Sequence, residues 1–284
     1  MSTAGVSDTP ATHVVIPDTQ VKPGVPLDHL KWIGRYIRDQ FYGKSNVTIV
    51  HLGDHWDMPS LSQWDQGKFA MEGRRVSEDI ESGNQGIRLL DEPTADRNAM
   101  MVRDKKAKWL PRKVLLRGNH EWRVNAYLEL HPNMRGFLSE SELRSPGWEV
   151  HPFLRPVYID GIGYAHFWQN PMTGKPLGGM AATRLKTVGH SFTMGHQQVL
   201  DHAIRFVAGQ SQHALIAGAC YLHDEDYKGY QGNAHWRGII VCHQVEDGSY
   251  DPMFISLDYL CRRYEGVRLR EFTPYRFPIL EEAP

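Results

Sequence analysis

The sequence predicts an α/β fold in which helices cover a parallel sheet. Three segments support this prediction: an apolar run at residues 14–17, a segment at 27–40 with apolar side chains at helical spacing, and a second apolar run at 47–52. A strand, a helix and a strand in this order favour a parallel sheet. Polar residues just past the strand ends should then meet at one edge of the sheet, where open α/β sheets bind ligands.

The elements that follow continue this alternation of helices and strands. The chain turns helical between residues 59 and 111, and we expect this insertion to overhang the site. Asp160-Gly161 is typical of a hairpin turn. The expected helices are 75–90, 97–110, 121–130 and 178–188, and the expected strands are 113–117, 157–159, 162–167 and 192–194.

The C-terminal part of the chain predicts a second sheet. Strand-like runs are separated there by turn residues, and they lie at 203–208, 214–219, 238–245 and 250–257. The tail from Arg262 has no readable pattern. We predict one domain at 12–260 that contains the 59–111 helical insertion, with terminal extensions at 1–11 and 261–284.

The composition is that of an ordinary globular protein. The chain has 284 residues and 41% apolar side chains, enough for a full core. Its 32 basic and 33 acidic side chains give a net charge of −1, so no bulk field attracts it to nucleic acid or to an anionic membrane. We find no signal-peptide pattern and no apolar run near the roughly 20 residues of a membrane span, and we expect a cytoplasmic protein. Three widely spaced cysteines are expected to be buried, reduced thiols.

Four short segments offer metal-ligand side chains at the ends of predicted strands. Any one of them would be a weak signal, because Gly-Asp and Gly-His pairs also occur in ordinary turns. Their order along the chain, each after an apolar run, carries the signal and indicates a metal site. The segments are Asp18-Thr19-Gln20, Gly53-Asp54-His55-Trp56-Asp57, Gly118-Asn119-His120-Glu121 and Gly195-His196-Gln197-Gln198.

These segments resemble the motifs of the calcineurin-like metallophosphoesterases, which read DxH, GDxxD, GNH[DE], a lone His and GHxH. The resemblance spans residues 12–199 and is strongest at 118–123. It implies a four-layer α/β/β/α sandwich of two mixed sheets with flanking helices. It also implies hydrolysis of a phosphate ester, with a phosphodiester favoured, at a dinuclear site whose two ions lower the pKa of a bridging water. Residues 118–123 and the helical insertion before them resemble phosphoesterases of bacteriophages and prophages. A phage-encoded protein would act in the cytoplasm of the host cell.

The resemblance assigns ligands to each of the two ions. Asp54 would bridge them and Asp18 would bind the first ion only. Asn119, His166 and His196 would complete the second ion's ligands. His166 is preferred over His190 for the lone His, because His166 follows the strand at 162–165 whereas His190 lies in a loop before the next strand.

Two glutamines depart from the family pattern, and both departures affect the first ion. Gln20 and Gln198 stand where the family has His. An amide oxygen is a harder and weaker ligand than imidazole, so we expect Mn²⁺ or Mg²⁺ at the site, with Ni²⁺, Fe and Zn²⁺ as alternatives.

The remaining motif residues are expected to act on the substrate. His120 would protonate or polarise the leaving oxygen, with Asp57 fixing its ring and tautomer. Arg123 could bind a phosphate oxygen in bidentate fashion or be a surface arginine. His55 would touch the substrate or merely line the loop.

Two other functions stay open. A non-catalytic or single-metal scaffold is favoured by Gln20 and Gln198 and opposed by His120. A metal-dependent nuclease acting on DNA or RNA would need a basic groove, and the basic stretch at 103–113 is either a solvated helix face or a guide for a polyanion. The acidic segment 223–226 is expected to be a solvated loop.

Overall fold

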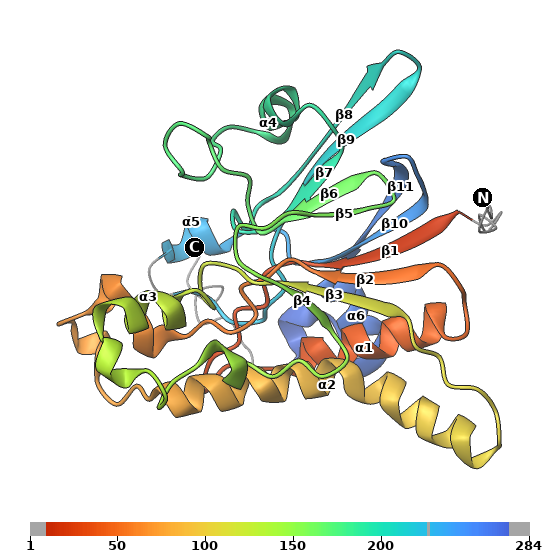
Figure 1. The fold of residues 1–284 in the computed structure, drawn as a ribbon. Helices are drawn as coiled ribbons and strands as arrows, with labels where there is room; N and C mark the ends of the chain where they lie inside the picture. Colours follow the sequence, from red (N-terminus) through yellow and green to blue (C-terminus); the bar gives the residue numbers. More distant parts are fainter. Residues whose placement is uncertain (1–9, 226–227, 273–284) are drawn as a thin grey trace, which may run out of the picture.

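The computed structural model describes residues 10–225 and 228–272, which form an α/β fold with two mixed sheets (Figure 1). The first sheet has six strands in the order β11-β10-β1-β2-β3-β4, and the second has five in the order β5-β6-β7-β9-β8. The first-sheet strands are β1 (Ala11–Ile16), β2 (Val47–His51), β3 (Arg112–Leu116), β4 (Glu149–His151), β10 (Gly238–Glu246) and β11 (Ser249–Ser256). The second-sheet strands are β5 (Val157–Ile159), β6 (Ile162–Ala165), β7 (Phe192–Met194), β8 (Leu200–Val207) and β9 (Gln210–Ala217).

The first sheet is parallel from β1 to β4. Val14 of β1 pairs with Ile49 of β2, and Val50 of β2 pairs with Val114 of β3. The central strands β1 and β2 are rich in apolar residues because both faces of the sheet are buried there, whereas the edge strand β4 is largely exposed. The predicted strand, helix and strand at the start of the chain are confirmed as β1, α1 (Asp28–Phe41) and β2.

Three helices cover the outer face of the first sheet: α1, α2 (Val76–Arg103) and α6 (Leu257–Glu265) (Figure 1). Leu30, Ile33 and Ile37 of α1 recur at helical spacing and are all buried in the core that these helices share with the sheet. The amphipathic pattern of the sequence therefore selects the face of α1 that packs on the strands.

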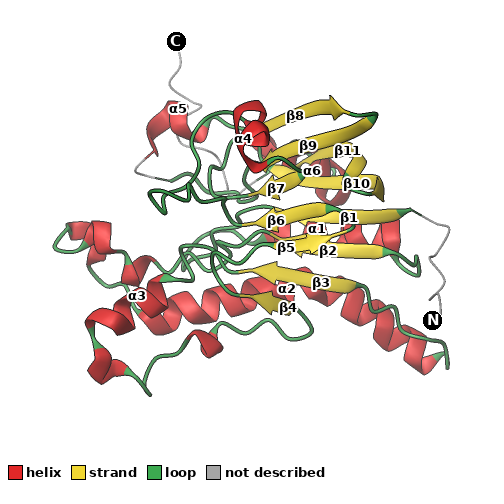
Figure 2. Cartoon of the chain, turned by 45° about the horizontal axis from the view of Figure 1, so that its top comes forward, coloured by secondary structure: helices red, strands yellow, loops and turns green. Residues whose placement is uncertain are grey.

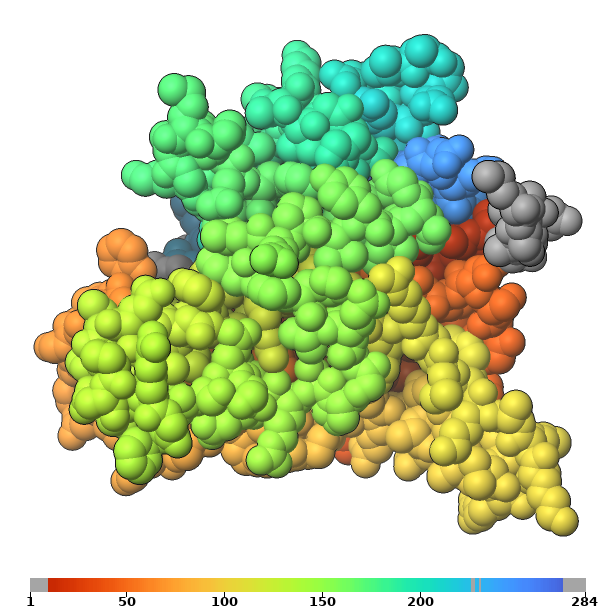
Figure 3. Space-filling model, in the orientation of Figure 1, coloured from red at the N-terminus to blue at the C-terminus, as the bar shows by residue number. Residues whose placement is uncertain are grey.

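The prediction of two separate helices at 75–90 and 97–110 is wrong, because α2 runs unbroken through Pro93. Pro93 is buried against α1, and a Cβ at Gly34 would lie 3.0 Å from its ring and 2.2 Å from the carbonyl oxygen of Leu90. The close packing of α1 and α2 offsets the helix hydrogen bond that a proline cannot donate. Figure 3 shows the C-terminal end of α2 and the loop after it projecting from the body of the molecule.

The second sheet begins with the predicted hairpin, β5 and β6, which pair antiparallel. Its outer face is covered by α4 (Ala181–Val188), whose Ala181 and Leu185 pack with Phe192 and Met194 of β7. Its inner face shares a core with the first sheet, and Figure 2 shows the strand axes of both sheets roughly aligned, with strands pointing either way along them.

The C-terminal strands differ from the prediction in where they pair. Runs 203–208 and 214–219 fall in the second sheet as expected, whereas 238–245 and 250–257 join the first sheet as β10 and β11. Alternate residues of β10 face two different cores, with Val241 on the helix side and Ile240 on the side of the second sheet. An apolar run buried on both faces does not reveal which sheet it joins.

The predicted domain boundary at residue 260 falls inside α6. Ser256 caps this helix by accepting a hydrogen bond from the backbone N–H of Tyr259 at 3.1 Å. Leu257, Leu260 and Cys261 form its buried side. The three cysteines are free and buried, as predicted.

The carboxyl ends of β1, β2, β6 and β7 all reach the left side of Figure 1, where α3 (Arg123–Leu130) and α5 (Gly229–Asn233) also lie. Loops that leave both sheets therefore meet at one edge of the molecule. Over the described residues, no helix combines the length and apolar character that crossing a membrane requires.

Candidate metal centre

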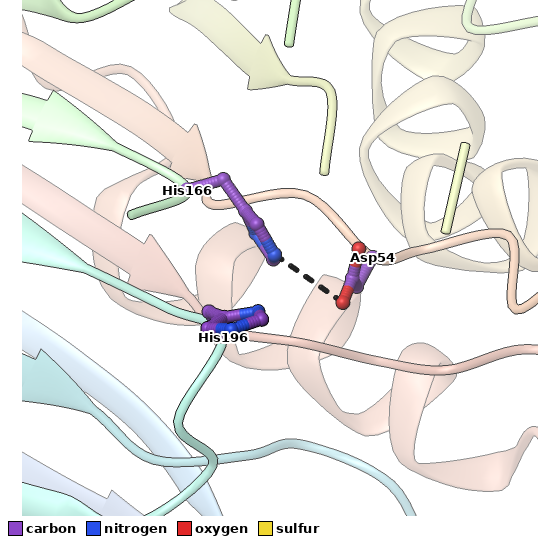
Figure 4. Close-up of side chains that lie close together, drawn as sticks. All are labelled: Asp54, His166 and His196. Atoms are coloured by element: carbon purple, nitrogen blue, oxygen red, sulfur yellow. Dashed lines mark ion pairs between the residues drawn. The ribbon is translucent and has the colours of Figure 1, made fainter. Parts of the chain in front are cut away.

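Asp54, His166 and His196 converge from three strand ends, and one ligand atom of each lies within 4.8 Å of those of the others (Figure 4). Asp54 follows β2 of the first sheet, whereas His166 and His196 follow β6 and β7 of the second. The Nε2 atom of His166 is 3.3 Å from the Oδ2 atom of Asp54. Both sheets thus contribute to one cluster.

Asn119 places its amide oxygen between the two imidazoles. The Oδ1 atom is 2.9 Å from Nε2 of His166 and 2.8 Å from Nδ1 of His196. The structure therefore brings together all four residues assigned to the second ion, Asp54 included. Carboxylate, amide and imidazole ligands suit a divalent transition metal such as Mn²⁺, Fe²⁺, Ni²⁺ or Zn²⁺.

The surroundings of His166 direct one ring nitrogen into the cluster. Its Nδ1 atom is 2.8 Å from the carbonyl oxygen of Leu52, to which an Nδ1–H would donate. The Nε2 lone pair is then free to face the cluster, which is the usual arrangement of a metal-binding histidine. His190, the alternative for this motif, packs against Tyr158 and Trp168 instead.

The two histidines of the cluster have opposite pKa shifts. Burial lowers the pKa of His166, but the carboxylates of Asp54 and Asp18 outweigh it and raise the pKa to about 9. Burial and the neighbouring His166 lower the pKa of His196 to about 4. A protonated His166 thus supplies the positive charge that Asp54 needs, and a metal cation would displace that proton.

Sharp backbone turns at Asp54 and His196 direct their side chains toward the cluster. Asp54 and His196 have positive φ angles of 49° and 66°, which are uncommon for residues other than glycine. The motif glycines make room beside them, since a Cβ at Gly118 would lie 2.1 Å from Oδ1 of Asp54. A Cβ at Gly195 would lie 2.3 Å from Oδ1 of Asp18.

Glu121 joins the second and third motifs, a role that the sequence analysis did not assign. Its buried carboxylate accepts hydrogen bonds from the backbone N–H groups of Asp54 at 3.0 Å, His55 at 2.6 Å and Trp56 at 3.1 Å, and from that of Gly118 at 2.7 Å. The only signal in the sequence is its place directly after Asn119-His120. Glu121 fixes the loop that carries the central carboxylate.

His120 lies beside the cluster and is held by Asp57. Its Nδ1 atom is 2.5 Å from Oδ1 of Asp57, and its Nε2 atom is 3.7 Å from Oδ2 of Asp54. Burial lowers the pKa of His120, yet the carboxylates of Asp54 and Asp57 outweigh it and the net shift is upward. Lys22 lies on the far side of Asp57, with 3.3 Å between Nζ and Oδ2.

Arg123 and His55 occupy different environments. Arg123 donates to the carbonyl oxygen of Asp57 at 2.8 Å, and its Nη2 atom is 3.3 Å from Nε2 of His120. His55 is fully buried, with its ring nitrogens 2.7 Å from Oγ1 of Thr19 and 2.9 Å from the carbonyl oxygen of Gly83. Both ring nitrogens of His55 are thus bonded to protein atoms.

Asp18 and Gln20 each bury a polar atom that has no hydrogen-bond partner among the described residues, Oδ2 in Asp18 and Nε2 in Gln20. The other carboxylate oxygen of Asp18 accepts from the backbone N–H of His196 at 3.1 Å. Burial raises the pKa of Asp18 to about 7. Unpaired buried polar atoms are rare in folded proteins, so each is expected to have a partner: a donor or a cation for Oδ2 of Asp18, and an acceptor for Nε2 of Gln20.

Gln198, the other glutamine assigned to the first ion, is engaged elsewhere. Its Oε1 atom accepts hydrogen bonds from the hydroxyl of Tyr221 at 2.9 Å and from the ammonium of Lys228. An amide oxygen has two lone pairs, so these donors occupy both. Of the residues assigned to the first ion, Asp18 keeps a carboxylate oxygen that accepts from no described residue, whereas the amide oxygen of Gln198 is occupied by other donors.

The expected solvated loop at 223–226 is in fact an ion-pair network over its described part; Asp226 lies outside the described residues. Glu225 is only 4% exposed, and its carboxylate lies 2.8 Å from Nζ of Lys22 and 2.9 Å from Nε2 of His223. Asp224 pairs with Arg237 at 2.7 Å. The prediction failed because local charge patterning does not reveal partners that are distant in the chain.

A comparison with models of known protein families finds no match for this chain. A comparison with curated proteins finds no match either.

Proposed function

We propose that this protein is a metal-dependent hydrolase of phosphate esters, with a phosphodiester as the favoured substrate. The observation that carries this proposal is that Asp54, His166 and His196 converge, with the amide oxygen of Asn119 between the two imidazoles and His120 beside Asp54. The four converging side chains would hold a divalent ion. When bound, such an ion lowers the pKa of a water and polarises a phosphoryl oxygen.

The chain's own residues would then handle the leaving group. Because the carboxylates of Asp54 and Asp57 outweigh burial and raise the pKa of His120, its imidazole can hold a proton near neutral pH. Asp57 fixes the ring through Nδ1, which leaves Nε2 to donate that proton to the leaving oxygen. Arg123 lies within 3.3 Å of the same nitrogen and could hold a phosphoryl oxygen next to it.

The fold supports the same proposal. Helices α1, α2 and α6 cover one sheet and α4 covers the other, which agrees with the four-layer sandwich that the resemblance implies. The candidate residues follow the strand ends, where α/β sheets bind ligands.

A hydrolysis assay tests the proposal. The substrates would be the diester bis(p-nitrophenyl) phosphate and the monoester p-nitrophenyl phosphate, with Mn²⁺, Mg²⁺, Ni²⁺ or a chelator present. We expect turnover with added metal, faster on the diester, and loss of turnover with the chelator. Turnover that persists unchanged with the chelator would contradict the proposal. Metal binding without any turnover would favour the alternative, a non-catalytic binding protein.

Nucleotides or nucleic acid are a second candidate substrate class, and Trp122 favours them. This side chain is 40% exposed, directly follows the third motif and lies against Phe153, with 5.9 Å between the ring centroids. Phe153 in turn lies 6.2 Å from the ring of His166. A nucleobase could therefore stack on Trp122 while its phosphate reaches the centre, and such stacking contributes about 1–3 kcal/mol.

Comparing two substrates tests this candidate. Trp122→Ala should raise KM for a dinucleotide by roughly 5-fold to 150-fold, the equivalent of the stacking energy. KM for an abasic analogue of the same dinucleotide should change much less, because it has no base to stack. Trp64→Ala is the matched control, since Trp64 is 85% exposed and lies outside the motifs. Equal effects on both substrates would rule out nucleobase stacking.

A further inference from the structure

We propose that the ammonium group of Lys228 takes the place of a second metal ion beside Asp18, so that the centre binds a single divalent ion. This inference rests on the proposed function and specifies how many ions the site needs. It starts from the side chains next to the metal cluster, where the predicted ligands of the first ion meet a lysine that no motif predicted.

The oxygen of Gln198 is the first observation. It accepts from Lys228 and from Tyr221, and the hydroxyl of Tyr221 is itself 3.0 Å from Nζ of Lys228. The three groups form a closed triangle of hydrogen bonds. A metal ion could use the oxygen of Gln198 only by displacing one of its two donors, and it would then lie next to the other.

The position of Lys228 is fixed by its surroundings. Its backbone N–H donates to the carbonyl oxygen of Glu225 at 3.0 Å, and its Nζ atom lies 5.7 Å from the ring centroid of Tyr221. Tyr221 is fully buried and cannot move aside easily. Glu225 itself is paired with Lys22 at 2.8 Å.

Charge balance is the second observation. Asp18 is completely buried, and its Oδ2 atom has no hydrogen-bond partner among the described residues. A buried carboxylate needs a nearby positive charge. The carboxylate of Asp18 and the ammonium of Lys228 are close enough to attract each other. The ammonium of Lys228 already lies on the oxygen of Gln198, the other ligand predicted for this ion, and it would repel a divalent ion held between Asp18 and Gln198.

The cluster of Asp54, His166 and His196 differs from the side of Asp18 and Gln198 in its cationic neighbours. No lysine or arginine is bonded to these three side chains in the described part of the chain, and their ligand atoms face one another. The two halves of the predicted dinuclear site are therefore unlike: the ligands of one bind no lysine or arginine in the described part of the chain, whereas in the other a predicted ligand already binds a lysine ammonium.

Counting bound metal tests the inference without relying on activity. Equilibrium dialysis of the full chain against Mn²⁺, followed by metal analysis, should give about one ion per chain, and electron paramagnetic resonance should show magnetically isolated Mn²⁺. About two ions per chain, with magnetic coupling between them, would overturn the inference and leave the proposed function intact. No bound ion would overturn the proposed function and this inference with it.

Variants test the role of the lysine itself. Gln198→His alone supplies an imidazole but keeps the ammonium, and should still bind about one ion. Gln198→His with Lys228→Ala should bind about two, because the competing cation is gone. Gln198→His with Lys186→Ala is the matched control, since Lys186 is an exposed lysine of α4. A folded Gln198→His, Lys228→Ala protein, checked by circular dichroism, that still binds about one ion would contradict the inference.

Discussion

At the residue scale, Asp54 is held by three other residues of the site, His120, His166 and Glu121. Its Oδ1 atom accepts from the backbone N–H of His120 at 2.9 Å, its Oδ2 atom is 3.3 Å from His166, and its own N–H donates to Glu121. Burial opposes ionisation of Asp54, but His120 and His166 outweigh it and hold its pKa well below the usual range. The carboxylate is therefore charged and ready to bind a cation.

Asp54→Ala should remove metal binding and activity together, because this carboxylate serves both the ion and His166. Metal content after dialysis and the rate of diester hydrolysis would be measured side by side. Asp251→Ala, at an exposed carboxylate of β11, is the control. Turnover within about tenfold of the parent protein would show that metal catalysis does not depend on Asp54.

His120→Ala should separate catalysis from metal binding. His120 is not among the converging ligands, so the variant should keep its metal and lose roughly 10²-fold to 10⁴-fold in rate, the usual contribution of a general acid. Metal content and the rate constant decide the outcome. Loss of metal would mean that His120 is a ligand and that its assigned role is wrong.

At the element scale, the loop after β2 is held in place by hydrogen bonds to Glu121, which lies in the turn just before α3. Glu121 accepts four backbone hydrogen bonds, three of them from consecutive residues of that loop. Burial is the main effect on its pKa and raises it, so these donors and the nearby Arg117 stabilise a carboxylate that would otherwise be costly to bury.

Glu121→Gln should therefore destabilise the fold as well as the site. The amide replaces one acceptor oxygen by a donor that faces backbone N–H groups, and we expect a loss of about 1–3 kcal/mol in the free energy of unfolding. Denaturant unfolding measures this loss. Glu129→Gln, at an exposed position of α3, should change stability little and is the control. Equal stability of the two variants would show that the Glu121 carboxylate is not needed.

The sequence could predict elements whose signals are local. The apolar spacing of α1 and the motif residues after β2, β6 and β7 depend only on neighbours in the chain, and parallel strands bring such residues to one edge. The contact of Gln198 with Lys228 joins residues 30 positions apart and has no periodic signal. The continuity of α2 through Pro93 likewise depends on packing against Gly34, which lies on another helix.

At the scale of the whole molecule, the cluster of Asp54, His166 and His196 lies at the junction of the two sheets. Asp54 comes from the first sheet, and His166 and His196 come from the second. Between these ends the sheets are joined by a shared apolar core that includes Val50 and Tyr164. A bound ion would therefore link the two sheets at the edge where that core ends.

Metal should consequently stabilise both sheets together. A ligand that binds only the folded state adds about 2.7 kcal/mol at a free concentration of 100 times Kd, and for this chain that corresponds to an increase of several degrees in Tm. Thermal unfolding with and without Mn²⁺ measures the increase, and Asp54→Ala should show none. Hydrogen exchange adds the spatial test, because protection should rise at the ends of β2, β6 and β7 at once. Protection confined to one sheet, or the same increase in Tm in Asp54→Ala, would mean that the ion binds somewhere other than between the sheets.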